Sequence, residues 1–503
     1  MIMTHEEAFL KAHQQLRDLI AFAQQASHDR LRIDLVERGL FSQLLQLGLS
    51  LLTAFVAQAG NGDVGEGATD IHGQPCKRLP EPHSRTYRSL FGLLTIGRFV
   101  YGTREGQKIQ SVPLDATLGL PEGEFSYVLE EWAQRLCVQG SFAEAVQSLD
   151  DLLGLRPSVR SLENMNQTVA DEAANFAAQR PTPPAKEEGE LLVLTADHKG
   201  VILRPTAAAV GSAQTPAEPR EAPRQPGQPP QRGKKKMACV GAVYTIARHV
   251  RTPQQILDEL QRKERNQDRP KPCHKHVWAE MTREIEDQVC VGRITLFGQM
   301  AEERLLRDPQ GKKTTICLYD GEKALWGCWE EFLPNSVGIL DLFHVLERLW
   351  KAAHCFHPEK SKAAAGFVEQ RLRQLLEGKV GYVIGGLRQM VTKHGLKGPK
   401  RKAVLEAAQY YENNREHMKY DEYLAGGYPI GSGVAEGACR HLVKDRLEQT
   451  GMRWTVEGAQ AMLYLRATYL NGNWAEFLDY RIQREQKRLY SQQAQEPRFE
   501  MAV

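Results

Sequence analysis

Length, composition and charge narrow the classes of protein to which this chain can belong. Its 503 residues suffice for two to four domains and at least one large core. The net charge is only +3, from 65 Lys and Arg against 62 Asp and Glu, so the overall charge does not identify a nucleic-acid partner. Local clusters of basic residues have to be examined instead. Nine cysteines without a Cys-x-x-Cys pair argue against a disulfide framework and favour a reducing cytosol.

Residues 1–62 are expected to form a helical region that mediates self-association. Thr4 and Glu7 make a capping box before apolar residues at helical spacing, and a leucine-rich tract follows. The most apolar stretch, residues 47–57, falls far short of the roughly 20 residues that cross a bilayer, and the acidic N-terminus is unlike a signal peptide. We therefore expect a cytoplasmic protein without membrane contact. Residues 63–85, rich in Gly, Pro, Asp and Glu, are typical of a linker.

Residues 86–180 predict a β-hairpin followed by helices. The alternating pattern of residues 86–112 favours the hairpin, with its turn at residues 102–106. Helical tracts are expected at residues 124–139, 142–153 and 158–176. The turn after Gly154 and the N-capping Ser158 match a helix-turn-helix, whose second helix would enter a DNA major groove. An ordinary helical hairpin has the same spacing.

Acidic residues follow two apolar strands in residues 190–345. The runs 190–196 and 314–319 are largely apolar and of strand length, and Asp197 and Asp320 come directly after them. Strands that are apolar on both faces lie inside a sheet covered by helices, and sites form at the carboxyl ends of such strands. Further strands are expected at residues 238–247 and 337–340, with helices at 253–266 and 275–290. Residues 204–236 are expected to be a disordered basic loop.

A third acid opens a helix that is expected to span residues 434–450. Gly431 and Gly433 allow a tight entry, with Ser432 as N-cap. Glu436 then leads a row with Arg440 and Lys444 at helical spacing, which suits either a metal ligand beside a phosphate backbone or an ion pair on a solvated helix. The helical, charged residues 346–425 form an insertion before a second part of the core at 426–475, and 476–503 is expected to be a polar tail.

Three carboxylates that converge in the fold could bind divalent metal ions. Asp197, Asp320 and Glu436 could together hold two Mg²⁺ or Mn²⁺ ions, one activating a water or a 3′-hydroxyl and the other stabilising the leaving oxygen of a phosphodiester. Without the metals, such close like charges would repel one another. The sequence separation of these acids carries little information by itself, so the argument depends on their structural context.

Several long blocks, in order, resemble a known family. They are TADHKG (195–200), LYDGEKALW (318–326), ILDLFHVLERLW (339–350) and GSGVAEGACRHLVKDRLEQTGMRW (431–454), with GAQAMLYLRA (458–467) close behind. In these blocks the chain resembles DDE-type transposases of bacterial insertion sequences, in the Kra-type group related to the Mutator-like superfamily. The resemblance runs from the Phe91-Gly92 hairpin to the tail. It implies an α/β RNase H-like catalytic domain with an α-helical insertion, plus a mainly α-helical N-terminal DNA-binding region with a small β-hairpin.

The resemblance also implies roles for particular residues. Asp197, Asp320 and Glu436 would be the catalytic triad and metal ligands, and Asp341 with His344 would match a D-x-x-H element. His344 would be a proton shuttle, a partner of a triad acid, or a core histidine. Where the family pattern has glycine, this chain has His198, whose imidazole would crowd the metal or face solvent.

DNA contacts are expected in two places. Arg440 and Lys444 would touch the backbone, and Arg453 with Trp454 would pin or stack an end base, unless Trp454 belongs to the core. The helix-turn-helix would contribute the remaining candidates, Arg156, Ser158 and Arg160.

The expected function is that of a transposase. It would bind the terminal inverted repeats of its own element as a homo-oligomer in the cytoplasm, associated with the nucleoid, and would cut and join double-stranded DNA with two Mg²⁺ ions. The alternatives are a catalytically decayed DNA-binding protein of transposase origin and an RNase H-like nuclease that does not transpose.

Overall fold

The computed structural model describes residues 5–102, 109–204, 235–261, 269–449 and 451–490. The chain divides into two compact units, residues 1–172 with 473–503 and residues 173–472. We call them the first and the second unit. The predicted disordered loop falls almost entirely on residues 205–234, which lie outside the described residues.

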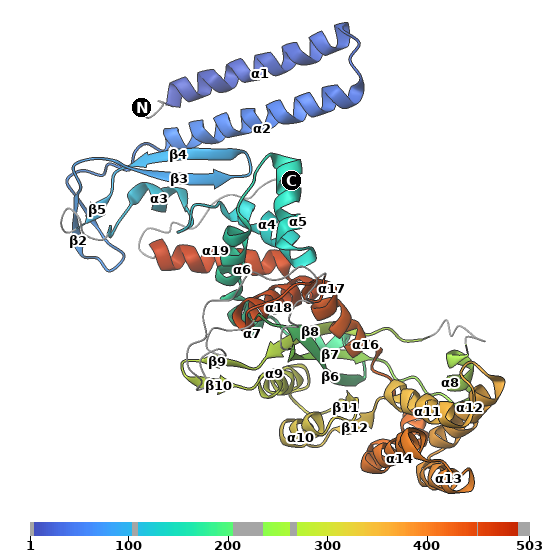
Figure 1. The fold of residues 1–503 in the computed structure, drawn as a ribbon. Coiled ribbons are helices and arrows are strands. Elements are labelled where there is room, and N and C mark those ends of the chain that lie inside the picture. Colours follow the sequence, from blue (N-terminus) through green and yellow to red (C-terminus); the bar gives the residue numbers. More distant parts are fainter. Residues whose placement is uncertain (1–4, 103–108, 205–234, 262–268, 450, 491–503) are drawn as a thin grey trace, which may run out of the picture. The chain divides into compact units, whose positions relative to one another are not determined.

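The first unit begins with two long helices, α1 (His5–His28) and α2 (Ile33–Gln58), which lie antiparallel and side by side (Figure 1). By length and composition alone, α2 could cross a membrane, although a core helix or a signal sequence passes the same test. The sequence analysis considered only the most apolar residues, 47–57, and therefore did not identify the whole of α2 as long enough to cross a membrane. Few residues of α2 are buried, and Phe41, Leu44, Leu51 and Phe55 are exposed.

Two small sheets follow α2. A three-stranded sheet has the order β1 (Gly67–Thr69), β2 (Pro75–Arg78) and β5 (Tyr101–Gly102), and a hairpin is formed by β3 (His83–Ser89) and β4 (Gly92–Arg98). The prediction of a linker at residues 63–85 was therefore wrong, since β1, β2 and the start of β3 lie there. The hairpin itself is present, but it turns at residues 90–91 and not at the predicted residues 102–106. The apolar face of β4 packs on α2, and this contact lies outside the local pattern from which the turn was predicted.

The rest of the first unit is helical, and its bounds are α3 (Pro113–Leu118), α4 (Tyr127–Gln139), α5 (Phe142–Leu153), α6 (Val159–Ala170) and α19 (Trp474–Tyr490). The pair α5 and α6 appears where the helix-turn-helix was predicted. Gly154 ends α5 with φ 65°, a left-handed conformation that favours glycine, and the Ser158 side chain caps α6. The predicted polar tail, residues 476–503, is helical up to residue 490 as part of α19, in which Arg481 pairs with Glu130 at 2.7 Å, and residues 491–503 lie outside the described residues.

A five-stranded mixed sheet forms the centre of the second unit. Its order is β12 (Val337–Leu340), β11 (Thr314–Tyr319), β6 (Leu191–Ile202), β7 (Lys235–Ile246) and β8 (Cys273–Met281). β6, β7 and β8 are antiparallel, whereas β11 and β12 run parallel to β6. The helix predicted at residues 275–290 was wrong. β8 pairs with β7 and contacts both α9 and α18, and this tertiary burial outweighs local helical spacing.

Helices cover both faces of this sheet (Figure 1). On one face, α9 approaches β7 so closely that Leu296 and Met300 fill the space beside Gly241. On the other face, α16 and the π-helical turn η4 contact β6 and β7. The bounds of the helices before the insertion are α7 (Ala173–Gln179), η1 (Ala185–Glu187), α8 (Pro253–Leu260), α9 (Gly292–Arg307) and α10 (Lys323–Phe332). β9 (Arg283–Ile285) and β10 (Gln288–Cys290) form a separate ribbon.

The residues predicted as a helical insertion, 346–425, are mainly helical. The bounds of these helices are α11 (Leu342–Phe356), α12 (Lys362–Leu376), α13 (Val380–Lys393), α14 (Gly398–Asn413), η3 (Arg415–His417) and α15 (Tyr420–Ala425). The chain then returns to the sheet through α16 (Gly433–Ala438), η4 (Cys439–Lys444), α17 (Asp445–Leu447) and α18 (Val456–Leu470). One apolar core continues from the sheet into the insertion, so the insertion is packed as part of the second unit.

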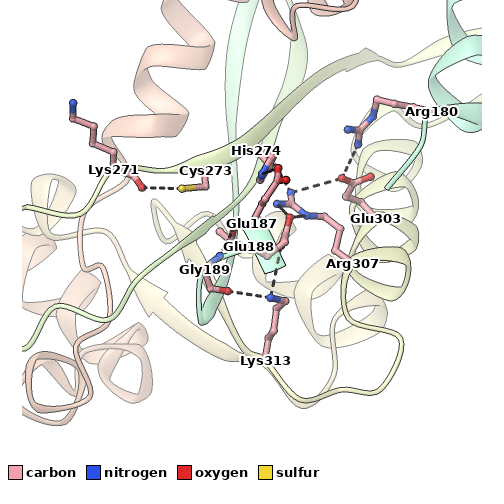
Figure 2. A network of polar contacts seen from close by, with 11 residues as sticks. Arg180, Glu187, Glu188, Gly189, Lys271, Cys273, His274, Glu303, Arg307 and Lys313 are labelled. Carbon is pink, nitrogen blue, oxygen red and sulfur yellow. Dashed lines mark hydrogen bonds and ion pairs between the residues drawn. The ribbon is translucent and has the colours of Figure 1, made fainter. Parts of the chain in front are cut away.

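A buried ionic network fixes the start of β6 (Figure 2). Arg307, at the end of α9, is fully buried against Glu188, and it also donates to the backbone oxygen of His274 at 3.1 Å. Lys313 donates to the backbone oxygen of Gly189 at 3.0 Å. Gly189 is needed here, because a Cβ would lie 2.6 Å from the Ile246 backbone. The network therefore anchors the strand that carries Asp197.

Candidate functional site

Three acids lie in register at neighbouring positions across the sheet. β11 pairs with β6 through Leu318 and Thr195, and two residues further along each strand are Asp320 and Asp197. β12 pairs with β11 through Leu340 and Tyr319, so the next residues are Asp341 and Asp320. Paired residues of parallel strands occupy matching positions. Asp197 on β6, Asp320 after the end of β11 and Asp341 after the end of β12 therefore form a row across these three strands.

Asp197 is held by backbone and side-chain contacts. Its strand does not end at this residue, as the sequence predicted, because β6 stays paired with β7 up to Ile202. The His198 amide donates to Asp197 Oδ1 at 2.6 Å, and the Cys439 thiol lies 3.5 Å from Oδ2. Burial raises the pKa of Asp197, and the negative charge of Asp320 raises it further. A carboxylate in this setting is stabilised by any cation that binds beside it.

Asp320 begins a tight turn between β11 and α10. Its Oδ1 accepts the Glu322 amide at 2.9 Å, and its backbone oxygen accepts the Tyr410 hydroxyl at 2.6 Å. Gly321, between them, has φ 89°, and a Cβ there would lie 2.9 Å from the Tyr410 ring. The helical insertion, which supplies Tyr410 from α14, therefore contacts the turn that positions this acid.

Asp341 is the buried member of the row and connects three parts of the site. Its carboxylate accepts the Phe343 amide at 2.8 Å, and it also accepts the Ser432 hydroxyl. Ser432 was predicted to cap α16, but its side chain makes no capping bond and turns to Asp341 instead. Burial of a carboxylate requires such partners, so this contact ties the entry of α16 to the end of β12.

His344 stands on the first turn of α11 beside the row of acids. Its Nδ1 lies 3.4 Å from Asp341 Oδ2, and its side chain is partly exposed. The contact with Asp341 raises the pKa of His344 to about 9, and the charges of Asp320 and Asp197 act in the same direction. At neutral pH the imidazole is therefore positively charged among carboxylates, which differs from an uncharged core histidine.

Glu436 lies on α16 and is exposed, with its carboxylate close enough to the row to interact with it. Although the residue as a whole is exposed, partial burial of its carboxylate raises its pKa, the negative charges of Asp341 and Asp197 raise the pKa further, and the charge of His344 lowers it. The predicted single helix is interrupted by the π-helical turn η4 after Ala438. This turn shifts the side chains that follow, so Arg440 pairs five residues on with Asp445 at 3.7 Å.

The site has the donor chemistry of a divalent-cation site. Asp197, Asp320, Asp341 and Glu436 offer carboxylate oxygens, which Mg²⁺ and Mn²⁺ prefer, and the raised pKa values of Asp197 and Glu436 are what a bound cation would reverse. In the part of the chain that the structure describes, no three His, Cys, Asp or Glu side chains are already grouped closely enough to hold an ion.

His198 does not point toward the face of the sheet on which the Asp197 side chain lies. Successive residues of a strand face opposite sides of the sheet, and His198 lies on the α9 side while Asp197 lies on the η4 side. Its Nδ1 is 2.7 Å from Glu322 Oε2. This position argues against crowding of a metal beside Asp197, and the imidazole does not face solvent either, because its side chain is largely buried.

The predicted DNA contacts fall into two environments. Arg440 and Lys444 are exposed on η4, and Arg453 is partly buried. Trp454 is buried, with its Nε1 donating to the backbone oxygen of Leu447 at 3.2 Å and the guanidinium of Arg446 over its ring. This packing favours the core alternative for Trp454. In the first unit, Arg156, Ser158 and Arg160 are exposed around the start of α6, which leaves their side chains accessible to a ligand.

The chain was compared with known proteins. No family model matches it, and no curated protein matches it in sequence. Among solved structures, a chain of the Drosophila P element transposase strand transfer complex is similar over 74% of this chain and 83% of that chain, with 11% identity and a TM-score of 0.24. A TM-score this low assigns neither a fold nor a function.

Proposed function

We propose that this protein is a DDE-type transposase that binds the terminal inverted repeats of its insertion sequence and catalyses Mg²⁺-dependent DNA strand cleavage and strand transfer. The observation that carries the proposal is the row of Asp197 and Asp320 across β6 and β11, with Glu436 on α16 close enough for the charges of Asp341 and Asp197 to raise its pKa. Acids on adjacent strands and a third on a returning helix are the arrangement expected from the sequence blocks.

Asp197, Asp320 and Glu436 are the proposed ligands of two Mg²⁺ or Mn²⁺ ions. When bound, such ions activate a water or a 3′-hydroxyl and stabilise the leaving oxygen of the phosphodiester. The chain's own residues prepare the site: Tyr410 and the Glu322 amide fix Asp320, while Ser432 and Asp341 fix the entry of α16. His344 adds a positive charge beside the acids, which favours an incoming phosphate.

Binding of the DNA is assigned to two exposed basic surfaces. Arg440 and Lys444 on η4 would contact the phosphate backbone close to the acids. The start of α6 in the helix-turn-helix, with Arg156 and Arg160, would recognise the terminal repeat. The mixed sheet with its helical insertion supports an RNase H-like assignment of the second unit. The exposed leucines and phenylalanines of α2 are the proposed contact of a homo-oligomer in the cytoplasm, at the nucleoid.

The deciding experiment measures Mg²⁺-dependent cleavage of a DNA fragment that carries the end of the element, with the native chain and with Asp320→Asn. Cleavage by the native chain alone supports the proposal. Specific binding without cleavage by either protein would favour a decayed DNA-binding protein. Cleavage that ignores the terminal-repeat sequence would favour a nuclease that does not transpose.

A further inference from the structure

A hydrogen bond on the far side of the sheet joins the two segments that carry Asp197 and Asp320. His198 Nδ1 lies 2.7 Å from Glu322 Oε2, although the residues are 124 positions apart. A carboxylate only accepts hydrogen bonds, so the imidazole nitrogen is the donor. The His198 side chain is largely buried, whereas that of Glu322 is nearly half exposed.

The same two residues also contact the acids through their backbones. The His198 amide donates to Asp197 Oδ1 at 2.6 Å, and the Glu322 amide donates to Asp320 Oδ1 at 2.9 Å. Each acid is thus oriented by the amide of a residue whose side chain reaches across to the other segment. A shift of either partner moves an amide that fixes a carboxylate.

The turn at Asp320 has few other restraints on this side. Gly321 gives it a left-handed conformation, and Tyr410 holds the Asp320 carbonyl from the insertion. Glu322 is the N-cap residue of α10, but its side chain makes no capping bond. Its side chain is therefore available to fix the turn against β6.

We propose that His198 and Glu322 form a positioning pair, which we call the cross-strand clamp, that holds the carboxylates of Asp197 and Asp320 at the spacing required for divalent-cation binding. The assignment of these acids as ligands rests on the proposed function, whereas the mechanical link between the two segments does not. Neither member of the clamp touches substrate or metal. Their action is through the two backbone amides.

We expect that the clamp can be broken without collapse of the fold. A cavity of about 230 Å³ lies beside the contact, lined by His198, Glu322, Glu280, Thr282 and Arg293 among others. Water can enter such a polar space, so His198→Ala leaves a hydrated gap and not an empty apolar void. His198→Asn keeps a side-chain N–H near the position of Nδ1 and serves as the conservative variant.

The first measurement needs no metal. Hydrogen–deuterium exchange of the full chain, followed in peptides that cover the Glu322 amide, should be about tenfold faster in His198→Ala, the size expected for loss of one hydrogen bond to a charged group. His198→Asn should restore most of the protection. As a matched control, His441→Ala removes a histidine–carboxylate contact of 2.9 Å to Asp445 in the same unit and should leave exchange at Glu322 unchanged.

The second measurement is Mn²⁺ affinity by calorimetry. His198→Ala and Glu322→Ala should each weaken it about 10- to 100-fold, with the double variant no worse than either single one. Unchanged exchange at Glu322 in His198→Ala overturns the clamp, whatever the activity. Faster exchange in His198→Ala, together with a native chain that binds no Mn²⁺, would support the link and reject the metal-dependent function. Native Mn²⁺ affinity in both single variants would overturn the role in cation binding.

Discussion

At the scale of single residues, the charge on His344 is the feature of the site that is most open to direct measurement. The imidazole contacts Asp341, and Asp320 and Asp197 add to the negative field around it. Because a positive charge is favoured there, the pKa of His344 rises from an ordinary value near 6.5 to about 9. The stability gained from this shift is fully present below about pH 6.5 and is lost as the pH rises through about 9.

Replacement of Asp341 by Asn should therefore return the pKa of His344 toward its ordinary value. Asparagine keeps the shape of the side chain but replaces the charged acceptor, whose hydrogen bond with His344 contributes most to the shift and whose charge adds to it. Two-dimensional NMR of the histidine side chains, recorded in a chelator over pH 5 to 10, measures the effect, and His344→Gln assigns the signal. A native His344 that titrates near 6.5 would show that the imidazole does not contact Asp341 in solution.

At the scale of elements, β6 is held at one end by the network that begins with Arg307 (Figure 2). Both Arg307 and Glu188 are buried, so removal of one partner leaves the other charge without compensation. We expect Arg307→Ala to lower the free energy of unfolding of the second unit by about 3–5 kcal/mol. Urea denaturation measures the change. Arg388→Ala, which breaks an exposed pair with Glu412, should cost only about 0–1 kcal/mol.

A comparably small effect of both variants would mean that the buried pair contributes no more than a surface pair. The double variant Glu188→Gln with Arg307→Met separates charge from packing, because it removes both charges together. It should lose less stability than Arg307→Ala alone.

Elements also show which parts of the fold could be predicted. Residues 314–319 and 337–340 form strands with the predicted bounds, because nearly all of their residues are buried and their sequences are largely apolar. β8 was not predictable in this way, since its polar residues suit a helix and only the neighbouring β7, α9 and α18 make it a strand. The π-helical turn in residues 439–444 has no signal in local spacing either.

The candidate site likewise has parts that could be predicted from local sequence and parts that could not. The apolar runs predicted the two strands that carry Asp197 and Asp320, but only Asp320 follows the end of its strand, because β6 continues past Asp197 to Ile202. The metal-binding and DNA-binding roles of the site residues stay predictions. The contacts that position the acids are distant in sequence: Ser432 is 91 residues from Asp341, and Glu322 is 124 from His198. Each of these contacts depends on the register of the folded sheet, which a single sequence does not specify.

At the scale of the whole molecule, the two units differ in how the chain builds them. The second unit is one continuous segment, residues 173–472, and its apolar core lies entirely inside that segment. The first unit combines residues 1–172 with 473–503, and α19 closes it through the buried Arg481 and its partner Glu130. The second unit alone therefore has what an independently folding domain requires, and the proposed catalytic residues all belong to it.

A fragment of residues 173–472 should fold and separate the two proposed activities. We expect a cooperative thermal transition, and Mg²⁺-dependent nicking of DNA without preference for the terminal repeat, because the helix-turn-helix is missing. The matched control is the full chain with Arg156→Ala and Arg160→Ala, which should lose specificity in the same way and show a shallower dependence of binding on salt, by about one unit per lost phosphate contact. Cleavage assays on DNA with and without the repeat measure both proteins. A fragment that still selects the repeat would place recognition in the second unit, close to Arg440 and Lys444.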